Sequence, residues 1–327
     1  MKPPTHSSSF PILFAVDLGG TRLRFGRVAS SGEWIDGEDQ ETRAGEGFPR
    51  LEAQLAEGLA RWRDRSEETG IPLKAAGIAV AGGVDIRRGW VTQTPNLPFP
   101  ADYPLGPFAE SILRVPVRLI NDANAFVLGE CWVGAAAVLS DVVGLTLGTG
   151  IGGGLVANGR LIEGAVGLGG EVGHLIVQPG GRRCGCGARG CLESLAGGRA
   201  IAERYVEARE ESGHPVPDGE KNAAREIVEF ARRGDPIAQR VLGEAAQALG
   251  AGLTGLVNLF NPQAVVIGGG LAAAWEELVT PAVDWMKQSA FRRSAEECRI
   301  LKSLLPPQRA GLLGAVRAAD RHAGGKP

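Results

Sequence analysis

The feature that most limits the folds open to this chain is a strand–glycine turn–strand pattern that occurs twice, about one domain apart. In the first copy, the apolar run Phe10–Val16 enters a glycine turn at residues 17–21, and a strand-like pattern then resumes. In the second, Val142–Leu147 enters a glycine run at 148–154, and Leu155–Ala157 returns toward an Asn-Gly hairpin turn. The pattern predicts an internal duplication with one phosphate-binding hairpin in each half. The alternative is that two common glycine-rich hairpins occur independently.

The length and charge of the chain narrow its class. Its 327 residues exceed what one hydrophobic core usually supports, which predicts two domains. With 35 basic and 37 acidic residues, the net charge of −2 lacks the basic excess of proteins that bind nucleic acid or anionic membranes. Apolar runs stay short of the ~20 residues of a membrane-spanning helix, and Met1–Pro11 lacks the apolar centre of a signal peptide. We therefore expect a cytoplasmic protein.

A cluster of cysteines gives the strongest chemical signal. Cys184, Cys186 and Cys191 follow closely after His174, whereas a secreted disulfide framework would spread its cysteines more evenly. Three thiolates and one imidazole form a closed tetrahedral Cys₃His set, which predicts a structural Zn²⁺ with no open position for water. The alternatives are reduced surface thiols or a disulfide.

Phosphate-binding chemistry is predicted at both glycine turns. Glycines let backbone N–H groups approach phosphate oxygens, and an aspartate at a strand end can hold Mg²⁺ directly or through water. The run at 148–153 also fits G-x-G-x-x-G, but a strand follows it where a dinucleotide-binding motif needs a helix. A P-loop motif is absent from the sequence. The residues predicted to bind Mg-ATP at the two turns are Asp17, Gly19, Gly20, Thr21, Gly148, Thr149 and Gly150.

Polar residues at a third strand end suit a proton-transfer role. Asn121 and Asp122 follow a short strand, where a fixed carboxylate can accept the proton of an attacking hydroxyl during phosphoryl transfer. The equally good alternative is that they cap the following helix. Glu171 and Glu193 flank the predicted metal ligands, and carboxylates in a rigid loop can bind the hydroxyls of a polyol. The alternative for each glutamate is a solvated surface charge.

Together these motifs resemble those of the ROK family (repressor, open reading frame, kinase), and most resemble its bacterial glucokinases. The resemblance covers the chain from about Phe14 to the C-terminal helix. It rests on Asp-Leu-Gly-Gly-Thr, Asn-Asp-Ala-Asn, Gly-Thr-Gly-Ile-Gly-Gly-Gly, the Glu-x-Gly-His and cysteine loop, and a Gly-Gly-Gly at 268–270. The cysteine loop is highly specific, whereas the glycine turns alone are not.

The resemblance implies an α/β fold of two actin-like (ribonuclease-H-like) domains around a central cleft. The small domain would comprise residues 1–121 plus about 308–327, and the large domain 122–307 with the zinc loop. It implies Asp122 as catalytic base and a His174 that ligates zinc through one ring nitrogen and faces the sugar with the other. Sugar contacts would come from Gly82, Asn96, Asn121, Asp122, Glu171, His174 and Glu193, and adenosine contacts from Gly268, Gly269 and Gly270.

Two positions depart from the family pattern. Pro98-Phe99 stands where many relatives carry a tryptophan, so the outer wall of the sugar pocket is expected to differ. Gly197-Gly198 replaces the usual Ser-Gly after Glu193, which removes a helix-capping hydroxyl.

Within the family, three readings compete. We expect an ATP-dependent kinase that phosphorylates the 6-hydroxyl of glucose; the runner-up is a kinase for N-acetylmannosamine or N-acetylglucosamine. Fructose, allose and a polyphosphate donor also stay open. A sugar-sensing protein without catalysis is the third reading, although the family's repressors carry an N-terminal DNA-binding domain and here about a dozen residues precede the first strand. Members of the family are commonly dimers or tetramers, so a homo-oligomer is expected.

Overall fold

The computed structural model describes residues 11–215 and 224–324. The sequence predicts a helical region over 222–259, and the start of that region, like most of the N-terminal segment, lies outside the described residues. The chain divides into two compact units. Unit 1 comprises Met1–Val138, Glu163–Gly169 and Leu304–Pro327, and unit 2 comprises Leu139–Ile162 and Gly170–Ser303. The first boundary thus follows residue 138, where 121 was expected, because helix α3 (Asp122–Val133) packs against the C-terminal helix α10 (Pro307–His322).

Unit 1 is built on a five-stranded sheet of order β3-β2-β1-β4-β7. β1, β2 and β3 pair in antiparallel fashion, and β4 and β7 run parallel to β1. A separate hairpin, β5–β6, follows β4. The strands are β1 (Ile12–Leu18), β2 (Arg22–Ala29), β3 (Trp34–Glu41), β4 (Leu73–Val80), β5 (Gly83–Asp85), β6 (Trp90–Gln93) and β7 (Val117–Asn121).

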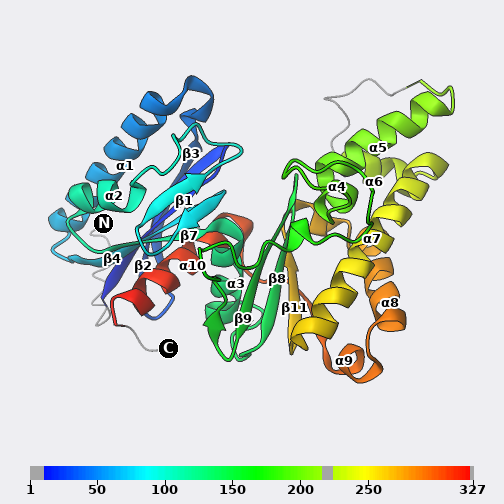
Figure 1. Ribbon diagram of the computed structural model, residues 1–327. Coiled ribbons are helices and arrows are strands. Elements are labelled where there is room, and N and C mark those ends of the chain that lie inside the picture. Colours follow the sequence, from blue (N-terminus) through cyan, green and yellow to red (C-terminus); the bar gives the residue numbers. More distant parts are fainter. Residues whose placement is uncertain (1–10, 216–223, 325–327) are drawn as a thin grey trace, which may run out of the picture. The chain divides into compact units, whose positions relative to one another are not determined.

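Helices cover both faces of this sheet, as Figure 1 shows. On one face, Phe14 and Val16 of β1 pack with Leu55 and Leu59 of α1 (Phe48–Glu68), next to α2 (Leu105–Leu113). On the other face, Leu13 and Ala15 of the same strand pack with α10. β1 is therefore buried on both sides, which explains why it reads as one continuous apolar run. A short 3₁₀ turn, η1 (Arg43–Glu46), precedes α1.

Unit 2 repeats the strand plan of unit 1. Its sheet has the order β10-β9-β8-β11-β12, with β8, β9 and β10 antiparallel and β11 and β12 parallel to β8. Each sheet therefore has three antiparallel strands followed by two parallel ones, and in each a glycine turn joins the first strand to the second. This shared topology supports the internal duplication. The strands are β8 (Val142–Leu147), β9 (Ile151–Ala157), β10 (Arg160–Leu161), β11 (Ala264–Gly268) and β12 (Arg299–Lys302).

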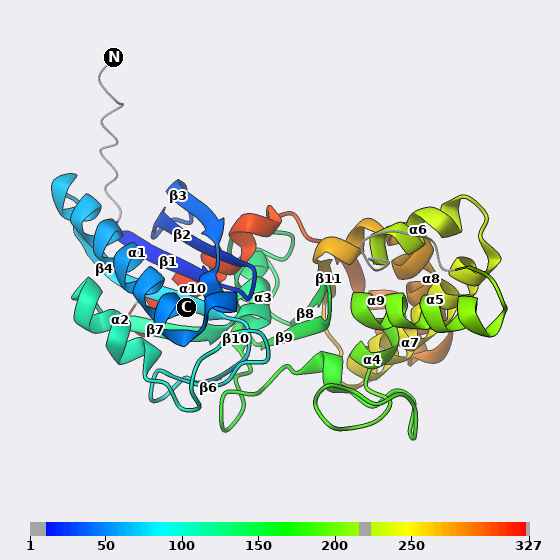
Figure 2. The same ribbon diagram turned by 90° about the horizontal axis from the view of Figure 1, so that it is seen from above.

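The helices of unit 2 gather on one side of β8 and β11 in both views (Figures 1 and 2). Leu145 and Ile267 of the sheet share a core with Leu249 and Leu253 of α7. α7 begins after the Asp235 cap and a first-turn proline, and ends where Asn261 adopts a left-handed conformation. The elements are α4 (Glu193–Ala196), α5 (Gly198–Glu211), α6 (Ala224–Arg232), α7 (Pro236–Phe260), α8 (Thr280–Ser289), α9 (Arg292–Glu297), the 3₁₀ turns η2 (Val172–His174) and η3 (Gly270–Ala273), and a π-helical turn (Trp275–Val279).

Candidate active site and metal centre

The first glycine turn joins β1 to β2 in unit 1. Asp17 pairs with Arg24 across this hairpin, and its Oδ2 accepts a hydrogen bond of 2.8 Å from the arginine Nη1. Burial raises the pKa of the Asp17 carboxyl, and the charge of Arg24 opposes that rise. A Cβ on Gly20 would lie 2.9 Å from the Asn96 Cβ, so the turn lies directly against the loop that carries Asn96. The sequence reasoning missed Arg24, although the pairing of a short hairpin places it opposite Asp17.

Asn121 and Asp122 lie where β7 meets α3, at the position for which sequence alone left a helix cap and a catalytic base as alternatives. Asn121 caps α3: its Oδ1 accepts from the backbone N–H groups of Ala123 and Asn124 at 3.0 and 3.1 Å. Its Nδ2 donates to the Gly82 carbonyl at 3.1 Å, which draws the predicted sugar-pocket glycine to the end of β7. Asp122 is the first residue of the helix and is exposed, with Oδ1 accepting from Ala123 N–H at 2.9 Å. Its carboxylate is thus fixed at a strand end and exposed to solvent.

The second glycine turn, in unit 2, is held from two sides. The Gly148 and Thr149 carbonyls accept N–H bonds of 2.9 Å from Gly198 and Arg199 at the start of α5. On the other side, Glu193 Oε2 accepts the Ile151 N–H at 2.9 Å. One oxygen of Glu193, a predicted sugar ligand, therefore supports the phosphate turn. Gly198, the second glycine of Gly197-Gly198, lies so close to the turn that a Cβ there would be 2.7 Å from the Gly148 carbonyl oxygen.

The third glycine segment lies beside this turn. β11 ends at Gly268, opposite Thr146 of β8, and Gly269 has a φ of +90°. A Cβ on Gly269 would lie 2.3 Å from the Leu147 carbonyl oxygen, so only glycine lets the chain pass this close to the end of β8. Unit 2 therefore brings Gly268–Gly270 next to the turn at 148–150, and both are predicted nucleotide contacts.

The effect of a side chain beside the second glycine turn can be measured as a change in the free energy of unfolding. A Cβ at position 198 would lie 2.7 Å from the Gly148 carbonyl oxygen. We expect Gly198→Ala to lower the free energy of unfolding by about 1–3 kcal/mol, because α5 and the turn must separate. The matched control is Gly255→Ala, at an exposed helix position where a Cβ meets no atom within 4 Å; it should stabilise by about 0.5–1 kcal/mol. Equal stability of the two variants in urea titrations would contradict the close contact.

The metal-ligand side chains converge in unit 2. The candidate ligand atoms of His174, Cys184, Cys186 and Cys191 all lie within 4.8 Å of one another. Cys184 Sγ lies 3.6 Å from His174 Nδ1, and Cys186 Sγ lies 3.7 Å from Cys191 Sγ. The second distance excludes a disulfide between that pair, since an S–S bond is about 2.05 Å. A tetrahedral Zn²⁺ with bonds of about 2.3 Å to sulfur and 2.0 Å to nitrogen would set edges of about 3.8 and 3.5 Å, so both distances fit.

The other ring nitrogen of His174 faces a carboxylate. Nε2 lies 4.0 Å from Glu171 Oε2, and the Glu171 side chain is exposed. Gly173 lets the turn that carries His174 pack tightly, since a Cβ there would lie 2.0 Å from the Ile151 carbonyl oxygen of β9. The geometry is consistent with the predicted split, with Nδ1 toward the cysteines and Nε2 toward a ligand beside Glu171.

The predicted residues thus form two groups, one in each unit. Contacts within unit 1 join Gly20 to Asn96 and Gly82 to Asn121, next to Asp122. Contacts within unit 2 join the turn at 148–150 to Glu193 and Gly269, and His174 to the cysteines and Glu171.

One family model matches nearly the whole chain: that of the ROK family, over residues 13–322. The chain belongs to the ROK family. The glucokinase of Thermotoga maritima is 34% identical to this ROK protein over 319 residues, which cover 96% of this chain and 98% of the relative. The ROK hexokinase structure from Thermus thermophilus superposes with a TM-score of 0.80 at 36% identity, covering 96% and 99% of the two chains. The structure of the ROK glucokinase of Streptomyces griseus, solved with glucose and AMPPNP, superposes with a TM-score of 0.78 at 32% identity. The match covers 95% of this chain and 99% of the glucokinase.

Two further relatives show how varied the family is. The xylose repressor of Caldicellulosiruptor bescii is 29% identical over 311 residues, covering 93% of this chain and 77% of the repressor. A Listeria monocytogenes structure provisionally assigned as an N-acetylmannosamine kinase gives a TM-score of 0.75 at 26% identity, covering 94% and 98%. The relatives that are at least 32% identical over nearly full length are kinases, so this ROK protein is a sugar kinase, as predicted. The predicted actin-like fold class is also confirmed.

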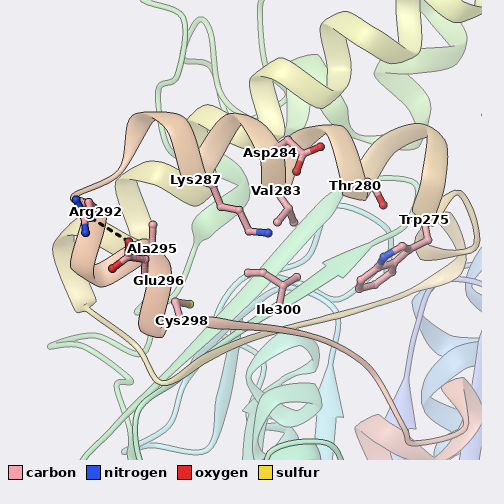
Figure 3. Close-up of a pocket in the computed structure, with 10 residues that line it drawn as sticks. All are labelled: Trp275, Thr280, Val283, Asp284, Lys287, Arg292, Ala295, Glu296, Cys298 and Ile300. Atoms are coloured by element: carbon pink, nitrogen blue, oxygen red, sulfur yellow. Dashed lines mark hydrogen bonds and ion pairs between the residues drawn. The ribbon is translucent and has the colours of Figure 1, made fainter.

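A separate cavity of about 610 Å³ lies between α8, α9 and β12 in unit 2 (Figure 3). Its charged rim is partly neutralised, since Arg292 donates to Glu296 at 3.0 Å. None of the residues that line it was predicted to bind sugar, nucleotide or metal. They are Trp275, Thr280, Val283, Asp284, Lys287, Arg292, Ala295, Glu296, Cys298 and Ile300.

Proposed function

We propose that this protein transfers the γ-phosphoryl group of ATP to the 6-hydroxyl of glucose, with Asp122 as general base. The observation that carries the proposal is the exposed Asp122 carboxylate, fixed at the end of β7 by the first turn of α3 and flanked by an Asn121 that already serves as the cap. A base in that position can accept the hydroxyl proton as the oxygen attacks phosphorus. Near-full-length similarity to glucokinases supports glucose as the acceptor.

ATP binding is assigned to the two glycine turns. Backbone N–H groups of Gly20, Thr21, Thr149 and Gly150 would contact the phosphates, and Gly268–Gly270 would lie near the adenosine. Gly19 and Gly148 would shape the two turns, because their own N–H groups donate to the Arg22 and Gly150 carbonyls at 3.0 Å. A bound Mg²⁺ would neutralise phosphate charge and orient the γ-phosphoryl group. Because Asp17 is engaged by Arg24 at 2.8 Å, we assign it to a water-mediated contact with this ion.

Sugar binding is assigned to the predicted polar side chains and to Gly82. Asn96 and Glu171 are exposed. The Asn96 amide can donate to or accept from a sugar hydroxyl, and the Glu171 carboxylate can accept from one. His174 would use Nε2, and Glu193 the carboxylate oxygen that does not hold the Ile151 N–H. Gly82 and Asn121 would shape the pocket at the end of β7 through their own hydrogen bond.

A structural Zn²⁺ is the metal we assign to His174 and the three cysteines. All four ligands come from the protein, which leaves no coordination position for a reacting water. The ion would therefore order the loop that carries His174 and Glu193, and would take no part in phosphoryl transfer.

The second candidate is an N-acetylhexosamine kinase with the same base and metal loop. The provisionally assigned N-acetylmannosamine kinase of the same fold supports it. The two functions differ only in whether the site accepts an acetamido group at C2 of the sugar.

An ADP-release assay decides between them. With MgATP, we expect kcat/KM for glucose to exceed that for N-acetylmannosamine and N-acetylglucosamine by at least about tenfold, because a pocket fitted to a hydroxyl must exclude the bulkier acetamido group. Mannose, fructose and allose complete the panel, a sugar-free reaction gives the background, and polyphosphate replaces ATP in a parallel series. A preference for an acetamido sugar would move the assignment to the second candidate. Sugar binding without turnover would favour a sensor.

Two weaker assignments accompany the function. We propose a homo-oligomer, dimer or tetramer, which light scattering would test. We also propose the cytoplasm as its compartment, since a Cys₃His site needs reduced thiols. Within residues 11–215 and 224–324, no helix has the length and apolarity to cross a membrane.

A further inference from the structure

The loop Glu163–Gly169, here called the strap, belongs to unit 1 although the segments on both sides of it belong to unit 2. It leaves β10 and leads, through Gly170, directly into Glu171 and His174. The strap therefore connects the end of unit 2's sheet to the predicted sugar loop by way of unit 1.

The strap is a closed loop seated on β5. Its two ends meet, because the Gly169 N–H donates to the Glu163 carbonyl at 2.9 Å. Gly167 has a φ of +83°, and a Cβ there would lie 2.2 Å from the Val84 carbonyl oxygen. The strap backbone thus lies flat against β5, with no room for a side chain at that point.

Both ends of the strap are tied to residues that flank Asp122. Nη2 of Arg118, on β7, contacts both Glu163 carboxylate oxygens at 2.8 and 3.1 Å, while its Nη1 donates to the Ile86 carbonyl at 2.9 Å. The two side chains are only 17% and 29% exposed. At the other end, the buried Asn124 donates through Nδ2 to the Gly169 carbonyl at 3.3 Å.

These ties act over a short length of chain. Consecutive Cα atoms are about 3.8 Å apart, so the Glu171 Cα is at most about 7.6 Å from that of Gly169. Arg118 precedes Asp122 by four residues and Asn124 follows it by two. The anchors therefore fix the strap residue from which the chain enters the predicted sugar loop.

We propose that Arg118, Glu163 and Asn124 are positioning residues for hexose binding. By holding the strap, they fix the residues from which the Glu171–His174 loop begins, and so position the polar groups of that loop for the sugar. This inference rests on the proposed function and deepens it. A pair that only stabilised the fold would affect stability without a selective effect on the sugar.

The test is a double-mutant cycle on steady-state kinetics. Arg118→Met keeps the aliphatic stem and Glu163→Gln keeps the shape, so both should fold. We expect each to raise the KM for glucose about tenfold, with kcat and the KM for ATP within about twofold, because misplaced binding groups weaken the contacts with the sugar. The double variant should be no worse than the worse single, since the two act as one unit. Asn124→Ala, which removes the second anchor, should raise the same KM.

The matched control is Glu38→Gln. Glu38 also receives one Arg61 Nη2 on both carboxylate oxygens, at 3.0 and 2.9 Å, but that pair lies on β3 and α1. The Glu38→Gln variant should change neither the KM for glucose nor the KM for ATP. The proposal is overturned if the strap variants keep the wild-type KM for glucose, if the two single effects add, or if both KM values rise together with a fall in thermal stability.

A binding measurement separates this proposal from the proposed function. Calorimetric titration with glucose in the absence of ATP gives the dissociation constant of each variant. If the wild type binds glucose but transfers no phosphoryl group, the proposed function fails. The ratio of the glucose dissociation constants of variant and wild type still tests the positioning role of the strap. It should be about ten if the strap positions the loop and about one if it does not.

Discussion

Asp122→Asn should lower kcat for hexose phosphorylation by about two to four orders of magnitude, the usual effect of losing a positioned general base. The amide is isosteric with the carboxylate, and its oxygen can still accept the Ala123 N–H that fixes the side chain at the start of α3. It cannot accept the hydroxyl proton. The dissociation constant for glucose should therefore stay within about threefold of the wild-type value.

The control is Asp64→Asn, which changes an exposed carboxylate on α1 that is paired with Arg63. Single-turnover rates and calorimetry on both variants complete the test. Residual activity of more than about a tenth in Asp122→Asn would exclude the base assignment. Loss of glucose binding together with activity would make Asp122 a ligand of the sugar and not its base.

Replacing a metal ligand should have the second large effect. We expect Cys184→Ser and Cys191→Ser to lose one zinc per chain in elemental analysis, because a serine hydroxyl does not replace a thiolate ligand. The melting temperature should fall by roughly 5–10 °C, since binding of a structural zinc contributes directly to folding. The KM for sugar should rise at least about tenfold, because His174 loses its fixed orientation.

Cys131→Ala is the control, since that thiol lies in α3 of unit 1, outside the cluster. A chelator should reproduce the shift in melting temperature in the wild type and leave the two serine variants unaffected. Full activity of a protein shown to be free of zinc would refute the structural role.

The features predictable from sequence were those encoded by neighbouring residues. β8 lies at Val142–Leu147, as predicted, and α10 begins one residue before the expected Gln308. The His174 and cysteine cluster assembled because its members are close in the chain. Asn121 at the cap of α3 also followed from local chemistry, although only the structure separated its role from that of Asp122.

The wrongly predicted boundaries of strands and helices lie at glycine-rich segments and where the hydrophobic pattern is weak. The return strand was expected at Leu155, but β9 begins at Ile151, because its glycines pair with β8 and Gly153 leaves space for Val172. The sequence also predicts a helix over 271–279, directly after the Gly-Gly-Gly segment. The structure has a 3₁₀ turn followed by a π-helical turn there, and regular helix begins at Thr280. The helical region expected up to Leu259 is broken at residues 233–235 between α6 and α7, where Gly234 has a positive φ.

Contacts between residues that are far apart in the chain could not be predicted from a single sequence. Glu193 reaches Ile151 across 42 positions, and Arg118 reaches Glu163 across 45. Such pairs depend on how the sheets and loops pack, which no local spacing encodes. They are also the contacts on which the strap and the second phosphate turn depend.

The return of α10 to unit 1 has a consequence for synthesis on the ribosome. Leu312, Leu313 and Val316 of α10 complete the core that Leu13 and Ala15 of β1 begin, so one face of that sheet lacks its cover until α10 has been translated. The longer of the two segments of unit 2, Gly170–Ser303, leaves the ribosome before α10 does. The sheet of unit 1 is therefore translated before unit 2 but is covered only after it, and nascent chains halted before residue 307 would expose an apolar sheet.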